Sequence, residues 1–180
     1  MTVELKTAIL DAHNELRNKA AAGLPNLNRK AIAMNTLVWS TELQRLATLN
    51  SKQCDMDHDD CRNTENFKKS GQNLAWKASP LPITPIKETI VDSIEKWFNE
   101  YMYAEGRDID SYSRATGKNG KLIGHFTCLV KDITSHVGCG AITYMEGENY
   151  NFYLVCNYGS KYYIINTIFM IHCILKSISL

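Results

Sequence analysis

Two histidines, His58 and His125, are the residues of this chain with the clearest capacity for chemistry. A neutral imidazole is a common ligand of zinc and similar divalent ions, and bound zinc can activate water for hydrolysis. The two residues lie far apart in the sequence, and neither belongs to a local metal-binding motif such as HExxH. No serine or cysteine lies in a recognisable nucleophile motif. From the residues alone, a hydrogen-bonded structural role is therefore the default interpretation, and a metal site is the alternative.

Six cysteines are present, and none shows the CxxC spacing of a zinc ribbon or a redox site. Cys139 and Cys156 fall on the two strands of a predicted hairpin, so a disulfide across the strands is geometrically reasonable. A bridge that closes a loop of this size would contribute about 3 kcal/mol to stability. We expect Cys128 to be a buried free thiol. Its pairing with Cys173 is an alternative without support from the sequence.

Hydrophobic periodicity predicts helices in the first part of the chain and strands in the second. The first helix has an apolar stripe through Leu5, Ile9, Ala12 and Leu16, with Arg17 on its opposite, polar face. Two further helices are predicted after an N-cap at Ser40 and from Ile86 onward. Strands are predicted at residues 126–131, 137–144 and 152–158, with a hairpin turn at 146–149. Helices followed by strands indicate an α+β domain.

Four segments in this order resemble the signature segments of the CAP superfamily, which includes cysteine-rich secretory proteins, insect antigen-five allergens and plant pathogenesis-related proteins. They are Cys54–Thr64, Gly71-Gln72-Asn73-Leu74, Gly124-His125-Phe126-Thr127 with Gly138-Cys139-Gly140, and Tyr153–Gly159. The first two segments are similar to the antigen-five branch in particular. The resemblance covers roughly residues 4–160. It implies a three-layer α-β-α sandwich with a small antiparallel sheet, and it supports the Cys139–Cys156 disulfide.

The resemblance also implies a site. In CAP proteins a histidine from each of the segments that hold His58 and His125 meets in a central cleft, with two glutamates nearby. This makes His58 and His125 candidate metal ligands, with zinc or another divalent ion as the expected cofactor. The second glutamate corresponds to Glu100. Gln72 stands where many members have the other glutamate, and an amide cannot titrate as a general base, so Gln72 and Glu100 are assigned to the cleft without a catalytic role.

The function implied is that of a secreted, non-enzymatic antigen-five-like protein that binds a small apolar ligand such as a lipid, a divalent metal or a protein receptor. Two alternatives stay open. One is a metal-dependent hydrolase that uses His58, Glu100 and His125, and the other is a structural or allergenic protein with a vestigial cleft. The net charge of +1 and the scattered basic residues argue against a nucleic-acid partner.

The two ends of the chain depart from the antigen-five pattern. We divide the chain into a CAP domain at residues 1–160 and an atypical apolar tail at 161–180. The apolar part of the tail is shorter than the roughly 20 residues of a membrane helix, so a membrane anchor is less favoured than a buried terminal element.

The first residues show no signal peptide, but the resemblance implies an extracellular location. Antigen-five proteins usually carry a cysteine-containing extension ahead of the first helix, and this chain starts at that helix. Cys54 and Cys61 are therefore expected to bridge each other or to stay reduced.

Overall fold

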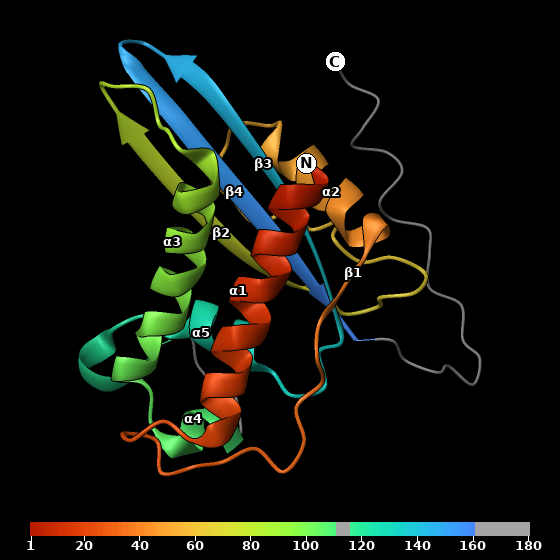
Figure 1. Cartoon of the computed structure of the whole chain (residues 1–180), viewed down its shortest axis with the longest axis vertical. Helices are drawn as coiled ribbons and strands as arrows, with labels where there is room; N and C mark the ends of the chain where they lie inside the picture. Colours follow the sequence, from red (N-terminus) through yellow and green to blue (C-terminus); the bar gives the residue numbers. More distant parts are fainter. Residues whose placement is uncertain (111–115, 161–180) are drawn as a thin grey trace.

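The computed structural model describes residues 1–110 and 116–160. Its helices and strands follow the chain in an order that mixes the two types more than the sequence indicates (Figure 1). The elements are α1 (Val3–Ala22), β1 (Val38–Trp39), α2 (Thr41–Ser51), β2 (Gly71–Ser79), α3 (Ile86–Asn99), the 3-10 helix η1 (Glu100–Tyr103), α4 (Gly106–Asp110), the 3-10 helix η2 (Lys118–Gly120), α5 (Gly124–Val130), β3 (His136–Glu146) and β4 (Asn149–Gly159).

Four strands form one sheet in the order β1-β3-β4-β2. The long hairpin of β3 and β4 is its centre, and β2 pairs antiparallel with β4 over its whole length. The two-residue strand β1 pairs parallel with β3. The sheet is therefore mixed, whereas the family resemblance implied an antiparallel one, although β3, β4 and β2 do pair antiparallel.

Helices cover both faces of this sheet, which confirms the predicted α+β layers. In Figure 1, α1 and α3 lie side by side in front of the strands, and their contact is extensive. Alternate residues of β4 divide between the faces: Leu154 and Cys156 belong to the core under α1 and α3, whereas Tyr153 and Val155 pack with Ala47 of α2. This alternation is the normal consequence of strand geometry.

Two glycines of β3 let α2 lie directly on the sheet. A Cβ atom at Gly138 would lie 2.2 Å from the backbone nitrogen of Gln44, and one at Gly140 would lie 2.5 Å from Cα of Thr48. Non-bonded heavy atoms do not approach so closely, so any larger residue at either position would push α2 away from the sheet. Ser40 caps α2 as predicted, because its hydroxyl accepts a hydrogen bond from the backbone N–H of Leu43 at 3.2 Å.

The prediction of a strand at residues 126–131 is wrong, because most of this segment forms α5. The short apolar run through Phe126, Leu129 and Val130 fits either a strand or a buried helix, and all three side chains are buried in the helical core. Strand β2 was not foreseen as a strand.

Arg17 does not lie on an exposed polar face of α1, as the sequence predicted. Its side chain is 1% exposed, and its guanidinium donates hydrogen bonds to five backbone carbonyls, those of Asn35, Leu129, Lys131, Asp132 and Thr134. Burial lowers the pKa of this guanidinium to about 10, so it stays charged at neutral pH. Arg17 thus fastens α1 to the segment that joins α5 to β3.

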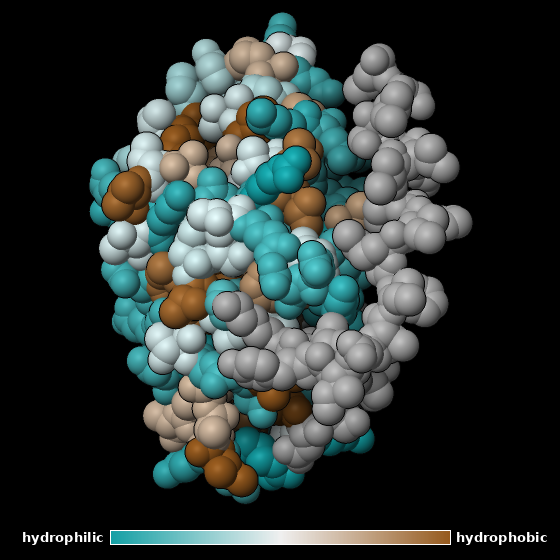
Figure 2. All heavy atoms as spheres, turned by 90° about the vertical axis from the view of Figure 1, so that its right-hand side faces the viewer, coloured by the Kyte–Doolittle hydropathy of each residue, from teal (hydrophilic) through white to brown (hydrophobic). Residues whose placement is uncertain are grey.

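The apolar tail predicted at residues 161–180 lies outside the described residues. Within the described part of the chain, no helix is both long enough and apolar enough to cross a bilayer. On the coloured part of the face in Figure 2, hydrophobic residues form small separate patches among hydrophilic ones. Such scattered apolar residues are normal for a protein surface.

Candidate functional site

His125 and Glu100 form a close pair where α5 begins. Nδ1 of His125 lies 2.6 Å from Oε1 of Glu100, and both side chains are partly buried. The indole of Trp97 stacks on the imidazole, with ring centroids 6.0 Å apart. Because a carboxylate accepts, Nδ1 carries the hydrogen, and in the neutral imidazole Nε2 keeps its lone pair. A histidine held in this way by a carboxylate is typical of metal ligands.

The same carboxylate caps α5. Oε2 of Glu100 accepts hydrogen bonds from the backbone N–H groups of His125 at 3.0 Å and Phe126 at 3.1 Å. The residue that precedes α5, Ile123, supplies no side-chain cap. Glu100 therefore satisfies N–H groups that the helix itself leaves without partners, and its negative charge is favourable at this end of the helix dipole. Its contact with His125 is thus part of a structural role.

His58 is exposed and lies in the loop before β2, where it pairs with Gln72. The distance from Nδ1 of His58 to Oε1 of Gln72 is 2.8 Å, and Nε2 of Gln72 donates to Asp59 Oδ2 at 3.0 Å and to Asn157 Oδ1 at 2.9 Å. The whole amide of this buried glutamine is satisfied. A glutamate at position 72 would lose both donated bonds and would face the carboxylate of Asp59, which is unfavourable for two ionised groups. Glutamine at this position is therefore matched to its neighbours.

Strand β2 connects the two histidine pairs. Gln72 and Asn73 are consecutive residues of β2, and Nδ2 of Asn73 donates to the backbone carbonyl of His125 at 3.1 Å and to the hydroxyl of Tyr158 at 3.2 Å. The structure thus brings His58 and His125 to the same end of β2, one through its side chain and the other through its backbone. Among the described residues, no group of three or more histidine, cysteine, aspartate or glutamate side chains is placed to hold a metal ion.

A buried hydrogen-bonded chain continues from Tyr158 into α1. The hydroxyl of Tyr158 lies 2.9 Å from Nε2 of His13, and Nδ1 of His13 lies 2.8 Å from the carbonyl oxygen of Ile9. A carbonyl only accepts, so Nδ1 carries the hydrogen and Nε2 accepts from the tyrosine. Burial lowers the pKa of His13 to about 4, which keeps the ring neutral at neutral pH. This chain holds β4 and β2 against α1, and so supports His125 indirectly.

The structure confirms part of the cysteine pairing that the sequence predicted. A disulfide joins Cys139 and Cys156, which lie directly opposite each other on β3 and β4. Cys54 is an exposed free thiol, so it does not bridge to Cys61. Cys128 is a free thiol whose sulfur lies against Gly71, and burial raises its pKa to about 12. The proposed partner Cys173 lies outside the described residues.

The sequence of the chain matches the CAP family, described as the cysteine-rich secretory protein family, over residues 10–158. The chain belongs to this family. The match contains both histidine pairs, the disulfide and all of the sheet except Gly159 at the end of β4. It therefore confirms the resemblance that the signature segments indicated.

Among characterised CAP relatives, the chain is similar to insect allergens. The antigen 5 like allergen Cul n 1 of Culicoides nubeculosus is 45% identical over 158 residues, which are 86% of this chain and 68% of that protein. Venom allergen-1 of Aedes albopictus is 41% identical over 159 residues, which are 88% of this chain and 61% of that protein. The chain therefore spans less than two thirds of the length of the Aedes protein.

Solved CAP structures share the fold. BmVAL-1 superposes with a TM-score of 0.73 at 20% identity, covering 89% of this chain and 79% of that one. The structure of NaASP2 with Zn2+ superposes with a TM-score of 0.64 at 22% identity, covering 89% and 85%. Identities this low establish the fold alone.

Three site residues of this CAP domain were missed by the sequence analysis: Asp59, Asn73 and Asn157. Each is a sequence neighbour of a residue that was singled out, namely His58, Gln72 and Cys156. This adjacency in the sequence was the signal that could have pointed to these three residues. It could not show that Asp59 and Asn157 converge on one amide, because that convergence depends on strand pairing between β2 and β4.

Proposed function

We propose that this CAP-family chain is an extracellular antigen-five-like protein that acts by binding and not by catalysis. The names of its relatives, an antigen 5 like allergen and a venom allergen, support this class of function. The Cys139–Cys156 disulfide supports an extracellular location, because disulfides persist in oxidising compartments.

The amide of Gln72 is the main support for the non-enzymatic part of the proposal. Its amide cannot titrate, and its three polar partners hold it in place. Glu100, the other cleft residue, already accepts three hydrogen bonds from α5 and the His125 ring. A hydrolase needs a base that can reach an attacking water, and neither of these residues is well suited to that role.

The donor set does not fit a catalytic zinc centre, because among the described residues no three histidine, cysteine, aspartate or glutamate side chains are placed to hold one ion, and any bound divalent ion would be held weakly. Nδ1 of each histidine faces an oxygen acceptor, so His58 and His125 would bind an ion through Nε2. A catalytic zinc site has three protein ligands, and the oxygens of Glu100 are already used. Bound zinc could polarise a ligand or its water; the histidines would hold the ion, and Glu100 and Gln72 would fix the orientation of their rings.

Zinc titration combined with an activity assay tests this proposal. We expect calorimetry at neutral pH to show weak binding at most, and to show none in a His58→Ala/His125→Ala variant. A His136→Gln variant controls for unspecific imidazole binding, because His136 lies at the start of β3 and bonds to Ser135. Hydrolysis of peptide and ester substrates should stay at the buffer rate with or without zinc.

A second variant makes the activity assay more demanding. Gln72→Glu combined with Asp59→Asn returns a carboxylate to position 72 without placing it against Asp59. We expect this variant to remain inactive. Zinc-dependent turnover by the natural chain that is lost in His125→Ala would overturn the proposal and favour a metal-dependent hydrolase.

A further inference from the structure

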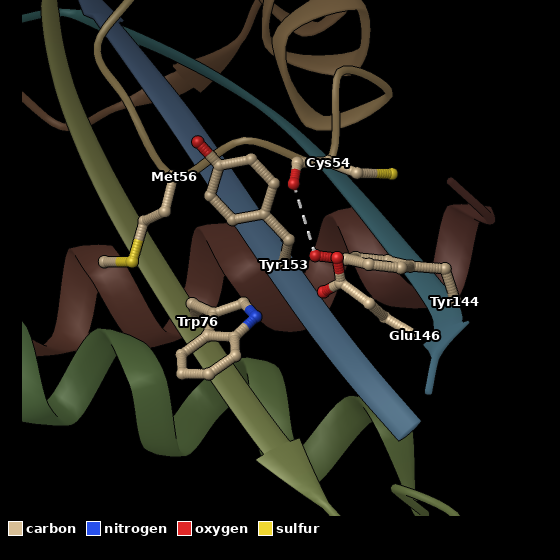
Figure 3. A pocket seen from close by; sticks show the side chains of 6 residues that line it. All are labelled: Cys54, Met56, Trp76, Tyr144, Glu146 and Tyr153. Carbon is tan, nitrogen blue, oxygen red and sulfur yellow. Dashed lines mark hydrogen bonds between the residues drawn. The ribbon is translucent and has the colours of Figure 1, made fainter. Parts of the chain in front are cut away.

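A different part of the molecule contains a second candidate site, on the face of the sheet that α2 covers. It is an open hollow of about 340 Å³. Figure 3 shows the residues that line it, which come from the loop after α2 and from three strands: Cys54, Met56, Trp76, Tyr144, Glu146 and Tyr153. We call it the aromatic hollow.

The aromatic hollow forms where α2 stops covering the sheet. This helix lies against Gly138 and Gly140 of β3 and ends at Ser51. Because side chains alternate along a strand, Tyr144 and Glu146 of β3 point to the same face as these glycines, but farther along. The end of α2 therefore leaves a part of the sheet that carries large side chains and is open to solvent.

Three aromatic rings define this space. Trp76 of β2 lies directly opposite Tyr153 of β4, so both rings are on one face, and Tyr144 of β3 completes the set. Trp76 is 48% exposed. In Figure 3 its indole nitrogen is directed toward the side of the hollow where Tyr144 and Glu146 lie. The face of an aromatic ring carries negative potential and attracts cations.

One acidic group lines the same space, and three others lie in the loop that borders it. Glu146 places a carboxylate at the hollow (Figure 3). Burial is the main cause that raises the pKa of Tyr153 to about 12, and the negative charges of three aspartates in the neighbouring loop add to it: Asp55, Asp57 and Asp59. The aromatic hollow therefore holds one carboxylate and lies near three more, in a chain whose net charge is +1.

We propose that the aromatic hollow binds a small organic cation, a protonated or quaternary amine carried on an apolar body. The exposed ring of Trp76 would contact the cation, and the carboxylate of Glu146 would balance its charge. The volume lies at the lower end for small-molecule sites, which suits a compact amine. A fatty-acid anion would instead bring a second negative charge beside Glu146.

This site rests on the proposed binding function, because it gives that function a ligand class, but it uses none of the residues of the two histidine pairs. Its failure would leave the hydrolysis and zinc results unchanged. Turnover at the histidines would contradict the proposed function without altering amine binding. The two proposals can therefore fail separately.

Titration of the whole chain with 2-phenylethylammonium chloride, beside its neutral analogue 2-phenylethanol, tests the proposal. We expect saturable quenching of tryptophan fluorescence by the amine, and affinity for the alcohol that is weaker by about tenfold or more. Trp76→Leu should abolish the quenching, and Glu146→Gln should weaken amine binding by about tenfold. Glu148→Gln is the matched control, since it removes the same charge from the exposed hairpin turn and does not line the hollow.

Several outcomes would overturn this assignment. Equal affinity for the amine and the alcohol would show a purely apolar site. Equal effects of Glu146→Gln and Glu148→Gln would show attraction by overall charge and no built site. Absence of saturable amine binding, or binding of oleate that Trp76→Leu removes, would exclude a cation as the occupant.

Discussion

The face of the sheet under α1, α3 and α5 and the face under α2 differ in how completely helices cover them. On the first face, polar side chains are buried and bonded within the protein: Arg17 to backbone carbonyls, and His13 to Tyr158. On the second face, α2 covers only part of the strands, and Trp76 and Glu146 remain open to solvent.

This difference separates a scaffold from a surface that can bind. Buried polar networks are costly to disturb, because each group that loses its partner stays away from water. Exposed aromatic and acidic groups contribute little to folding and keep their capacity for a ligand. His125 belongs mainly to the scaffold, since Glu100 and Asn73 bond its backbone, whereas His58 is exposed.

The largest expected effect concerns Arg17. Arg17→Met would leave five backbone carbonyls, two of them fully buried, without their guanidinium partner, and we expect the free energy of unfolding to fall by about 3–5 kcal/mol. Chemical denaturation monitored by circular dichroism measures this. Arg45→Met, on the exposed side of α2, is the matched control and should change stability by less than about 0.5 kcal/mol. Similar losses in both variants would contradict the scaffold role of Arg17.

The pH dependence of stability should report His13. Its pKa is about 4 in the folded protein and 6.5 in the unfolded chain, so between these values only the unfolded chain binds the proton. The contribution of His13 to stability is therefore fully present above pH 6.5. It is lost as the pH falls to 4, which lowers the free energy of unfolding by about 3 kcal/mol. The measurement is the difference in pH profile between the natural chain and a His13→Gln variant. Parallel profiles would show that His13 is accessible to protons in the folded state.

The smallest effect is expected on the other face. Trp76→Ser removes a large side chain that is already 48% exposed, so we expect a stability change of less than about 1 kcal/mol. Thermal unfolding measures it. A Trp97→Ser variant gives the contrast, because Trp97 is buried and its indole donates to the carbonyl of Leu74 at 3.0 Å. A large loss for Trp76→Ser would mean that the aromatic hollow is part of the core.

The sequence predicted the helices and the hairpin where local signals were strong. The apolar stripe of α1, the Ser40 cap of α2 and the alternating strands of the hairpin all have a local physical cause. The prediction failed at α5 because a short apolar run does not distinguish strand from helix. This segment is helical in part because Glu100, which is distant in the sequence, caps its first turn.

The sequence predicted the residues of the candidate site better than it predicted the contacts between them. His58, Gln72, Glu100 and His125 were named from family signatures, and the structure arranges them as two pairs. Their pairing, the contribution of Asp59, and the burial of Arg17 depend on which strands and loops meet. A single sequence carries no direct record of such contacts.

By itself, the sequence determined the family, the helical and strand periodicities and the pairing of Cys139 with Cys156, because these follow from local patterns and signature segments. Only the tertiary structure decided that Arg17 is buried, that Glu100 caps a distant helix and that Trp76 stays open beside Glu146. The physical reason is that burial and hydrogen-bond partners are properties of packed neighbours, and those neighbours are brought together from distant parts of the chain.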